Sequence, residues 1–134
     1  LETFVTLSPV PGFNKWLKQN NPTLHDKIID KNSIVSIEKE ILNSSIEYFF
    51  KAKYKDGLPL DPVQRFHLSN GASLDKIHSL GNLSKKGIAS SGGLMVNYKY
   101  EMGNLENNHE KYFSREVIAS SKSLLSKFNK IKNS

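Results

Sequence analysis

The sequence predicts a mixed α and β domain in which short strands lie between two long helices. A helical period of apolar residues runs for about five turns from Ile34 to Phe50, and a second amphipathic stripe lies near the C-terminus. Short runs of branched and aromatic residues, bounded by proline or glycine, have the pattern of strands. A chain of 134 residues provides for one domain with a single core.

Composition excludes several classes of protein. With 37% hydrophobic and 24% charged residues, the chain has no apolar run near the length that spans a membrane. Zero cysteines exclude disulfide scaffolds, thiol nucleophiles and cysteine zinc sites, which fits a reducing compartment. The formal net charge of +6 favours a polyanionic partner, and nucleic acid, an anionic membrane and a phosphate-bearing small molecule all remain open.

The two ends of the chain bear on its location. Residues 1–7 have neither a basic segment nor a long apolar core, so we predict no signal peptide, and Leu1 in place of methionine suggests a truncated or processed piece. The final residues Lys132, Asn133 and Ser134 are not a peroxisomal signal. We therefore expect the cytoplasm or an organellar matrix.

The N-terminal quarter predicts a strand followed by two short helices. Phe4, Val5 and Leu7 form a β-prone run that ends in the proline-rich segment 8–12. A helix is expected next, because apolar residues recur at helical spacing behind Pro11 and stop at 20–22; they are Phe13, Trp16 and Leu17. Thr23 with Asp26 imitates a capping box and predicts a second brief helix.

The middle and C-terminal parts predict a long helix, a strand and a final helix. The helical period from Ile34 ends where 56–59 supply glycine and proline, and an Asn-Gly turn lies at 69–71. Residues 94–100 follow two glycines and favour a strand. The final helix has one apolar stripe, formed by Val117, Ser121, Leu124, Phe128 and Ile131.

Few residues suit chemistry by pattern alone. Glycine-rich phosphate loops, the GxSxG elbow and the paired zinc histidines are absent from the sequence. His25 and His109 lie in polar helical stretches typical of solvated surface residues. His67 falls between Phe66 and a leucine, just before the turn, where partial burial can tune an imidazole. Ser8 ends the first apolar run, so its hydroxyl could face a cleft or simply serve the loop.

Three ordered blocks resemble a known family. The first is Thr6-Leu7-Ser8-Pro9-Val10-Pro11-Gly12-Phe13 with Trp16-Leu17, and the second joins Asp61-Pro62-Val63 to Phe66-His67-Leu68 and Asn70-Gly71-Ala72. The third runs from Gly87-Ile88 through Gly93-Leu94-Met95-Val96-Asn97-Tyr98-Lys99-Tyr100 to Glu106-Asn107-Asn108-His109-Glu110-Lys111-Tyr112. Together they closely resemble the C-terminal half of malonyl-CoA decarboxylase, with 18–60 matching only as a helical spacer.

The resemblance implies a fold, a reaction and a site. It implies part of an acetyltransferase-like (GNAT-type) domain that decarboxylates malonyl-CoA to acetyl-CoA and CO2, with Ser8 and His67 as catalytic residues. Tyr100 matches a tyrosine that lines the same pocket, although a strand aromatic is as often a core residue. We place Asn70 beside it as a substrate-binding residue. No metal and no cofactor are implied.

The chain also departs from the family pattern. Between Ala72 and Gly87 the family shows an asparagine-tryptophan pair and a later alanine-aspartate, whereas this chain reads His78-Ser79-Leu80-Gly81-Asn82. We expect residues 1–134 to be the C-terminal portion of a catalytic domain, without the N-terminal helical domain and the upstream CoA-binding loop. Partners would be malonyl-CoA and either the upstream part of the enzyme or a second copy of the chain.

Two other functions compete with this interpretation. The chain could be an acyl-CoA-binding or acyltransferase-related domain without decarboxylase activity, which assays of malonyl-CoA consumption against acyl transfer to an amine would separate. Nucleic-acid binding is disfavoured, because the lysines are scattered without an aromatic-interleaved basic patch. Membrane binding is likewise not expected.

Overall fold

The computed structural model describes residues 2–133, so Leu1 and Ser134, on which part of the expectations about location depends, lie outside the described residues. The elements follow one another in this order: β1 (Thr3–Pro9), α1 (Phe13–Asn20), α2 (Pro22–His25), α3 (Lys31–Ser36), α4 (Glu38–Lys51), α5 (Pro62–Ser69), β2 (Ser73–His78), α6 (Lys85–Ser91), β3 (Met95–Glu101), the short 3-10 helix η1 (Met102–Asn104), α7 (Leu105–Ser114) and α8 (Lys122–Lys132).

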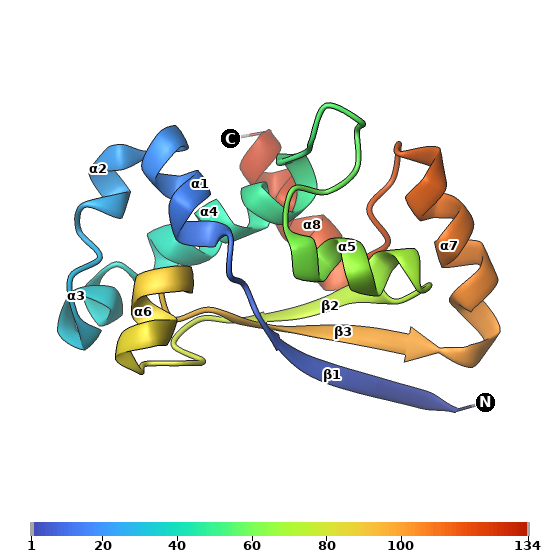
Figure 1. Cartoon of the computed structure of the whole chain (residues 1–134), viewed down its shortest axis with the longest axis horizontal. Helices are drawn as coiled ribbons and strands as arrows, with labels where there is room; N and C mark the ends of the chain where they lie inside the picture. The colour runs from blue at the N-terminus through green and yellow to red at the C-terminus, as the bar shows by residue number, and fades with distance from the viewer. Residues whose placement is uncertain (1, 134) are drawn as a thin grey trace.

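The three strands form one antiparallel sheet in the order β1-β3-β2, so the last strand of the chain lies at the centre. Helices α5 and α8 pack on β2, and Figure 1 shows them above the strands with α4 behind. Helices α1, α2, α3 and α6 gather at the end of the sheet where β1 leads into α1 (Figure 1). The mixed α and β prediction is confirmed at this level.

Aromatic and aliphatic side chains from helices and strands meet in one core. Its largest fully buried members are Phe13, Leu17, Ile34, Ile41, Ile46, Tyr48, Phe49, Leu68, Leu74, Leu94 and Tyr98. Tyr48 on α4 contacts the rings of Phe13 and Trp16 on α1 at 5.7 and 5.2 Å between centroids. The core therefore joins the loop after β1 to the helices that follow it.

The strands predicted from residues 4–7 and 94–100 are confirmed as β1 and β3, and so are the helix at Phe13 and the short helix after Asn21. The cap of that short helix was predicted wrongly. Asn21, and not Thr23, accepts the backbone N–H of Leu24 at 3.1 Å, with Pro22 in the first helical turn. Asn21 is the N-cap because Pro22 directly after it takes the first helical position, which places Thr23 already inside the helix.

The helix predicted from Ile34 to Phe50 is two helices. α3 ends at Ser36 and α4 begins at Glu38, because Ile37 leaves helical geometry with φ of −117° and ψ of 23°. The final helix also begins later than the apolar stripe suggests, since Ser121 is its N-cap and accepts the backbone N–H of Leu124 at 3.2 Å. Val117 lies before this helix and is half-exposed.

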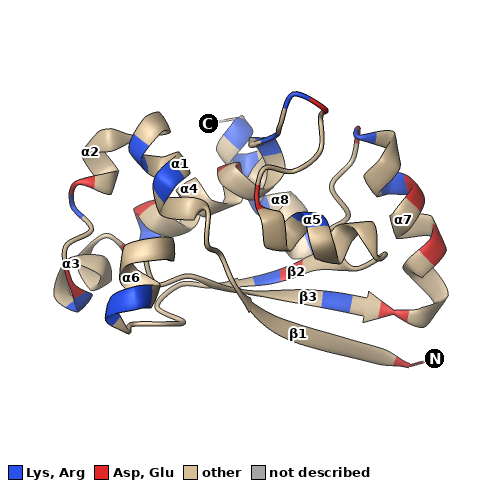
Figure 2. Cartoon of the chain, in the orientation of Figure 1, with Lys and Arg blue, Asp and Glu red and all other residues tan. Residues whose placement is uncertain are grey.

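Charge is spread over the fold. In Figure 2 lysine and arginine colour segments of α1, α6, β3 and α8, with acidic residues between them on several elements. Among residues 2–133 no helix is both long and apolar enough to cross a membrane.

Candidate active site

β1 presents alternate side chains toward α5. The register pairs Phe4 with Tyr100, Thr6 with Tyr98 and Ser8 with Val96. Because strand side chains alternate between faces, these residues share one face of the sheet. Ser8 is 6% exposed, so its hydroxyl is directed into the structure at the end of the strand.

His67 lies in the last turn of α5, above that face. The helix begins with Asp61 as N-cap and Pro62 in its first turn, which explains why a short polar segment folds locally as a helix. The Nε2 atom of His67 is 3.2 Å from Ser8 Oγ, and its Nδ1 atom is 2.5 Å from the Tyr100 hydroxyl. Thus the structure brings Ser8, His67 and Tyr100 into one hydrogen-bonded chain.

Aromatic rings hold the imidazole. Tyr98 lies beneath His67, with ring centroids 4.5 Å apart and planes 20° from parallel. Phe66 meets the same ring edge-on at 5.2 Å, and Phe4 stacks on Tyr100 at 4.8 Å. Both phenylalanines are more than half exposed, so apolar surface borders the polar chain.

Burial shifts the pKa of two of these residues, His67 and Tyr100. Burial lowers the pKa of His67, because the charged imidazolium loses hydration. Burial raises the pKa of Tyr100 for the same reason, since tyrosinate is its charged form. Near neutral pH the resting site therefore holds a neutral imidazole between the hydroxyl groups of Ser8 and Tyr100. This arrangement is favourable for moving a proton.

Asn70 lies beside the hydrogen-bonded residues Ser8, His67 and Tyr100 and is not one of them. It is exposed at the C-terminal end of α5, where its Nδ2 atom donates to the Phe66 carbonyl at 3.0 Å. The next residue, Gly71, has φ of +91°, and a Cβ there would lie 2.5 Å from the Leu105 carbonyl oxygen. The Asn-Gly turn thus ends the helix that carries His67 and lets α7 approach closely.

Sequence reasoning missed two contributors to the site. Thr6 Oγ1 is 3.5 Å from Ser8 Oγ, and Tyr98 supports the His67 ring. The signal for both was the period of two along a strand, since Thr6 precedes Ser8 and Tyr98 precedes Tyr100 by two positions. That period alone places the two members of each pair on one face of the sheet.

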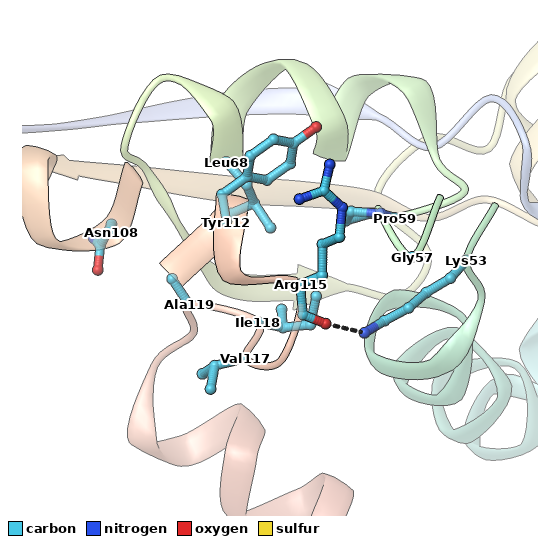
Figure 3. A pocket seen from close by; sticks show the side chains of 10 residues that line it. All are labelled: Lys53, Gly57, Pro59, Leu68, Asn108, Tyr112, Arg115, Val117, Ile118 and Ala119. Atoms are coloured by element: carbon cyan, nitrogen blue, oxygen red, sulfur yellow. Dashed lines mark hydrogen bonds between the residues drawn. The ribbon is translucent and has the colours of Figure 1, made fainter. Parts of the chain in front are cut away.

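A small cavity near α5 and α7 does not belong to this site. It has a volume of about 10 Å³, which is about one water molecule, and Lys53, Leu68, Tyr112 and Arg115 are among its lining residues (Figure 3). Lys53 Nζ donates to the Arg115 carbonyl at 3.1 Å, and this bond joins two of the lining residues (Figure 3). Among residues 2–133, no group of three histidine, aspartate or glutamate side chains is arranged to hold a metal ion.

The chain is similar to proteins of one family. The family model described as "Malonyl-CoA decarboxylase C-terminal domain" matches residues 1–134. Mitochondrial malonyl-CoA decarboxylases of the goose Anser anser anser and of Mus musculus are each 30% identical over 94% of this chain, covering 32% and 33% of those proteins.

Solved structures agree with the sequence comparisons. Malonyl-CoA decarboxylase from Rhodopseudomonas palustris is 42% identical, with a TM-score of 0.83 over 93% of this chain and 33% of that one. The enzyme from Agrobacterium vitis is 36% identical, with a TM-score of 0.83 over 96% of this chain and 36% of that one. The chain spans about a third of the length of these relatives. It therefore belongs to the malonyl-CoA decarboxylase family, through a match to the family's C-terminal domain.

Proposed function

We propose that this chain provides the proton-transfer residues of a malonyl-CoA decarboxylase, which converts malonyl-CoA to acetyl-CoA and CO2. The observation that carries the proposal is the contact of 3.2 Å between Ser8 Oγ and His67 Nε2, made by residues far apart in sequence. Family membership supports the same reaction. Ser8 and His67 are proposed as catalytic residues, and Tyr100 and Asn70 as substrate-binding residues.

The reaction needs two contributions. When the bond between the carboxylate carbon and C2 of the malonyl group breaks, its electron pair moves into the thioester and leaves an enolate of acetyl-CoA. Hydrogen-bond donors must stabilise the charge on the thioester oxygen. A proton must then reach C2, and it must come from a group with a pKa near the working pH.

The hydrogen-bonded groups Ser8, His67 and Tyr100 can deliver the proton that C2 requires. A protonated His67 donates from Nε2 to Ser8 Oγ and from Nδ1 to the Tyr100 oxygen. The Ser8 hydroxyl then gives its proton to C2 while His67 returns one to Ser8, and a neutral imidazole remains. Because burial lowers the pKa of His67, the imidazolium is a stronger acid and a smaller fraction of the resting protein.

Finer parts of the proposal concern the fold and its setting. We propose that residues 1–134 are the C-terminal portion of an acetyltransferase-like (GNAT-type) catalytic domain, which works with the upstream part of the polypeptide or with a second copy. The resemblance of the three sequence blocks supports this. We propose the cytoplasm or an organellar matrix as its location, since the relatives named above are mitochondrial or come from bacteria.

One assay tests the proposed function. A polypeptide of the relatives' length that carries residues 1–134 is mixed with malonyl-CoA, and acetyl-CoA and CO2 are measured over time. We expect both products in equal amounts. Malonyl transfer to an added amine without release of CO2 would overturn the proposal and favour the acyltransferase-related alternative.

A further inference from the structure

A buried carboxylate joins the two segments that carry Ser8 and His67. Asp61 is 1% exposed and is the N-cap of α5. Its Oδ1 atom accepts the Tyr48 hydroxyl at 2.8 Å, and its Oδ2 atom accepts the backbone N–H of Gln64 at 3.0 Å. Burial raises the pKa of this side chain, and the nearby backbone N–H groups of Gly12 and Val63 oppose that rise by favouring its charged form. Two hydrogen bonds thus hold the carboxylate, with two further N–H groups near it.

The residues around Asp61 come from three parts of the fold. Gly12 belongs to the loop that follows Ser8, Tyr48 lies on α4, and Val63 and Gln64 lie in the first turn of α5, which ends near His67. A buried carboxylate that caps one helix needs only that helix's own N–H groups. The hydrogen bond from Tyr48 therefore goes beyond capping, and Gly12 packs against both Tyr48 and Asp61, so the loop of Ser8 meets the helix of His67 here.

Close packing leaves little freedom at this junction. A Cβ atom at Gly12 would lie 2.6 Å from the Tyr48 hydroxyl oxygen and 3.7 Å from Asp61 Oδ1. Gln64 fixes the same turn of α5 to α4, because its Nε2 atom donates to the Phe49 carbonyl at 2.9 Å. The position of α5 relative to the Ser8 loop is thus set at Asp61.

We propose that Asp61 is a positioning residue, which keeps Ser8 Oγ and His67 Nε2 in contact by joining the Gly12 loop to the start of α5. Tyr48 acts with it by donating its hydroxyl hydrogen. Asp61 does not touch the reacting atoms in this role. The kinetic test of this proposal rests on the proposed function, whereas the spectroscopic test does not.

The first measurement is kinetic. Asp61→Asn and Tyr48→Phe are made in the polypeptide of family length, and circular dichroism at the assay temperature verifies that each is folded. We expect kcat to fall about tenfold or more while KM for malonyl-CoA changes less than about threefold, because displaced catalytic groups act on a substrate still bound. In the His67→Asn background, Asp61→Asn should cause no further loss. Equal losses in both backgrounds would overturn the proposal.

The second measurement does not depend on activity. Nuclear magnetic resonance of ¹⁵N-labelled histidine reports the tautomer and the hydrogen bonding of His67, whose two ring nitrogens contact Ser8 and Tyr100 in the parent. We expect the Asp61→Asn protein to show a mixture of tautomers or a shift in these signals. Unchanged His67 signals in both variants would contradict the proposal even if the parent proved not to be a decarboxylase.

Asp30 provides the matched control. It is also an aspartate N-cap, and its Oδ1 atom accepts the Ser33 N–H at 2.9 Å, but it is exposed and caps the separate helix α3. Asp30→Asn removes the same charge from the same kind of cap. We expect it to leave kcat and the His67 signals unchanged, and an effect equal to that of Asp61→Asn would show that capping alone is responsible.

Discussion

Each ring nitrogen of His67 has one hydroxyl partner, and this limits what the imidazole can do. A neutral imidazole donates from one nitrogen and accepts at the other, so Ser8 and Tyr100 cannot both donate to it or both accept from it. Protonation makes both nitrogens donors, after which both oxygens must accept. The protonation state of His67 therefore determines the direction of both hydrogen bonds.

Replacing the two residues proposed as catalytic should lower turnover. In the polypeptide of family length, His67→Asn should reduce kcat about a hundredfold or more, because asparagine cannot transfer a proton at neutral pH. Ser8→Ala should also reduce kcat. His25→Asn, which removes a histidine on the separate helix α2, serves as control and should retain normal turnover. Near-normal turnover by folded His67→Asn and Ser8→Ala proteins would mean that other residues catalyse the reaction.

Acid should selectively weaken the folded state that contains His67. Its pKa is lowered by burial, whereas the unfolded chain has the ordinary value of about 6.5, so the unfolded state binds more protons in the acid range. The stability contributed by the neutral side chain is present above about pH 6.5 and is lost as pH falls through its folded pKa. The raised pKa of Asp61 has the opposite sign.

The measurement is the free energy of unfolding by urea at several pH values for the parent and for His67→Asn. The contribution of Asp61 is common to both proteins and cancels in their difference. We expect the parent to lose stability relative to the variant as pH is lowered from about 8 to about 5. A constant difference across that range would contradict the burial of His67.

Residue chemistry alone could not have identified the site. Both His67 and Ser8 admitted an ordinary structural role, and only the resemblance of whole sequence blocks favoured catalysis. Their contact joins positions 59 apart and depends on how α1 to α4 return the chain to β1. Local sequence patterns do not encode such a distance. Asp61, proposed above as a positioning residue, stood in the sequence only within the block Asp61-Pro62-Val63, where nothing marked it for that role.

At the scale of elements, regular periodicity predicted the strands β1 and β3 and the helix α1 well. It failed at Ile37, where the apolar period continues although the backbone leaves helical geometry. A helical period shows which side chains face the core, but it does not show whether one helix or two successive helices carry them. It also gave no strand at β2, whose sequence SLDKIH lacks clear alternation. Pairing with β3 and a register shift between Leu74 and Lys76 define that strand.

Two neighbouring leucines test how α8 is held. Leu124 is 4% exposed and Leu125 is 45% exposed, although both lie on the same helix. Leu124→Ala should lower the free energy of unfolding by about 2–5 kcal/mol, because it removes buried apolar contacts and leaves a cavity. Leu125→Ala should change it by about 0.5 kcal/mol or less. Similar losses, measured by urea unfolding, would mean that α8 does not pack as described.

At the scale of the whole molecule, β1 lies at one edge of the three-stranded sheet and carries the half-exposed side chains of Phe4, Val5 and Leu7. Backbone groups along such an edge can pair with a further strand. Ser8 lies next to the last residue of this same strand, so anything that pairs with β1 also approaches the site. The relatives are about three times as long as the chain, so most of their length lies outside the part that matches this sheet.

The 134-residue polypeptide by itself should therefore decarboxylate malonyl-CoA far more slowly than a relative of full length, even with Ser8 and His67 in contact. Binding energy from the remote CoA moiety positions the malonyl group so that the breaking bond overlaps the thioester, and such positioning can lower the barrier by several kcal/mol. The chain matches only about a third of the relatives' length, and we expect part of the CoA-binding surface to lie in the remainder. The measurement is acetyl-CoA formation by equal amounts of the purified chain and the Rhodopseudomonas palustris enzyme, with Ser8→Ala as the blank for the chain. Comparable rates for the two proteins would show that residues 1–134 already hold the CoA moiety, and the search for its contacts would then turn to the described surface around β1 and α5.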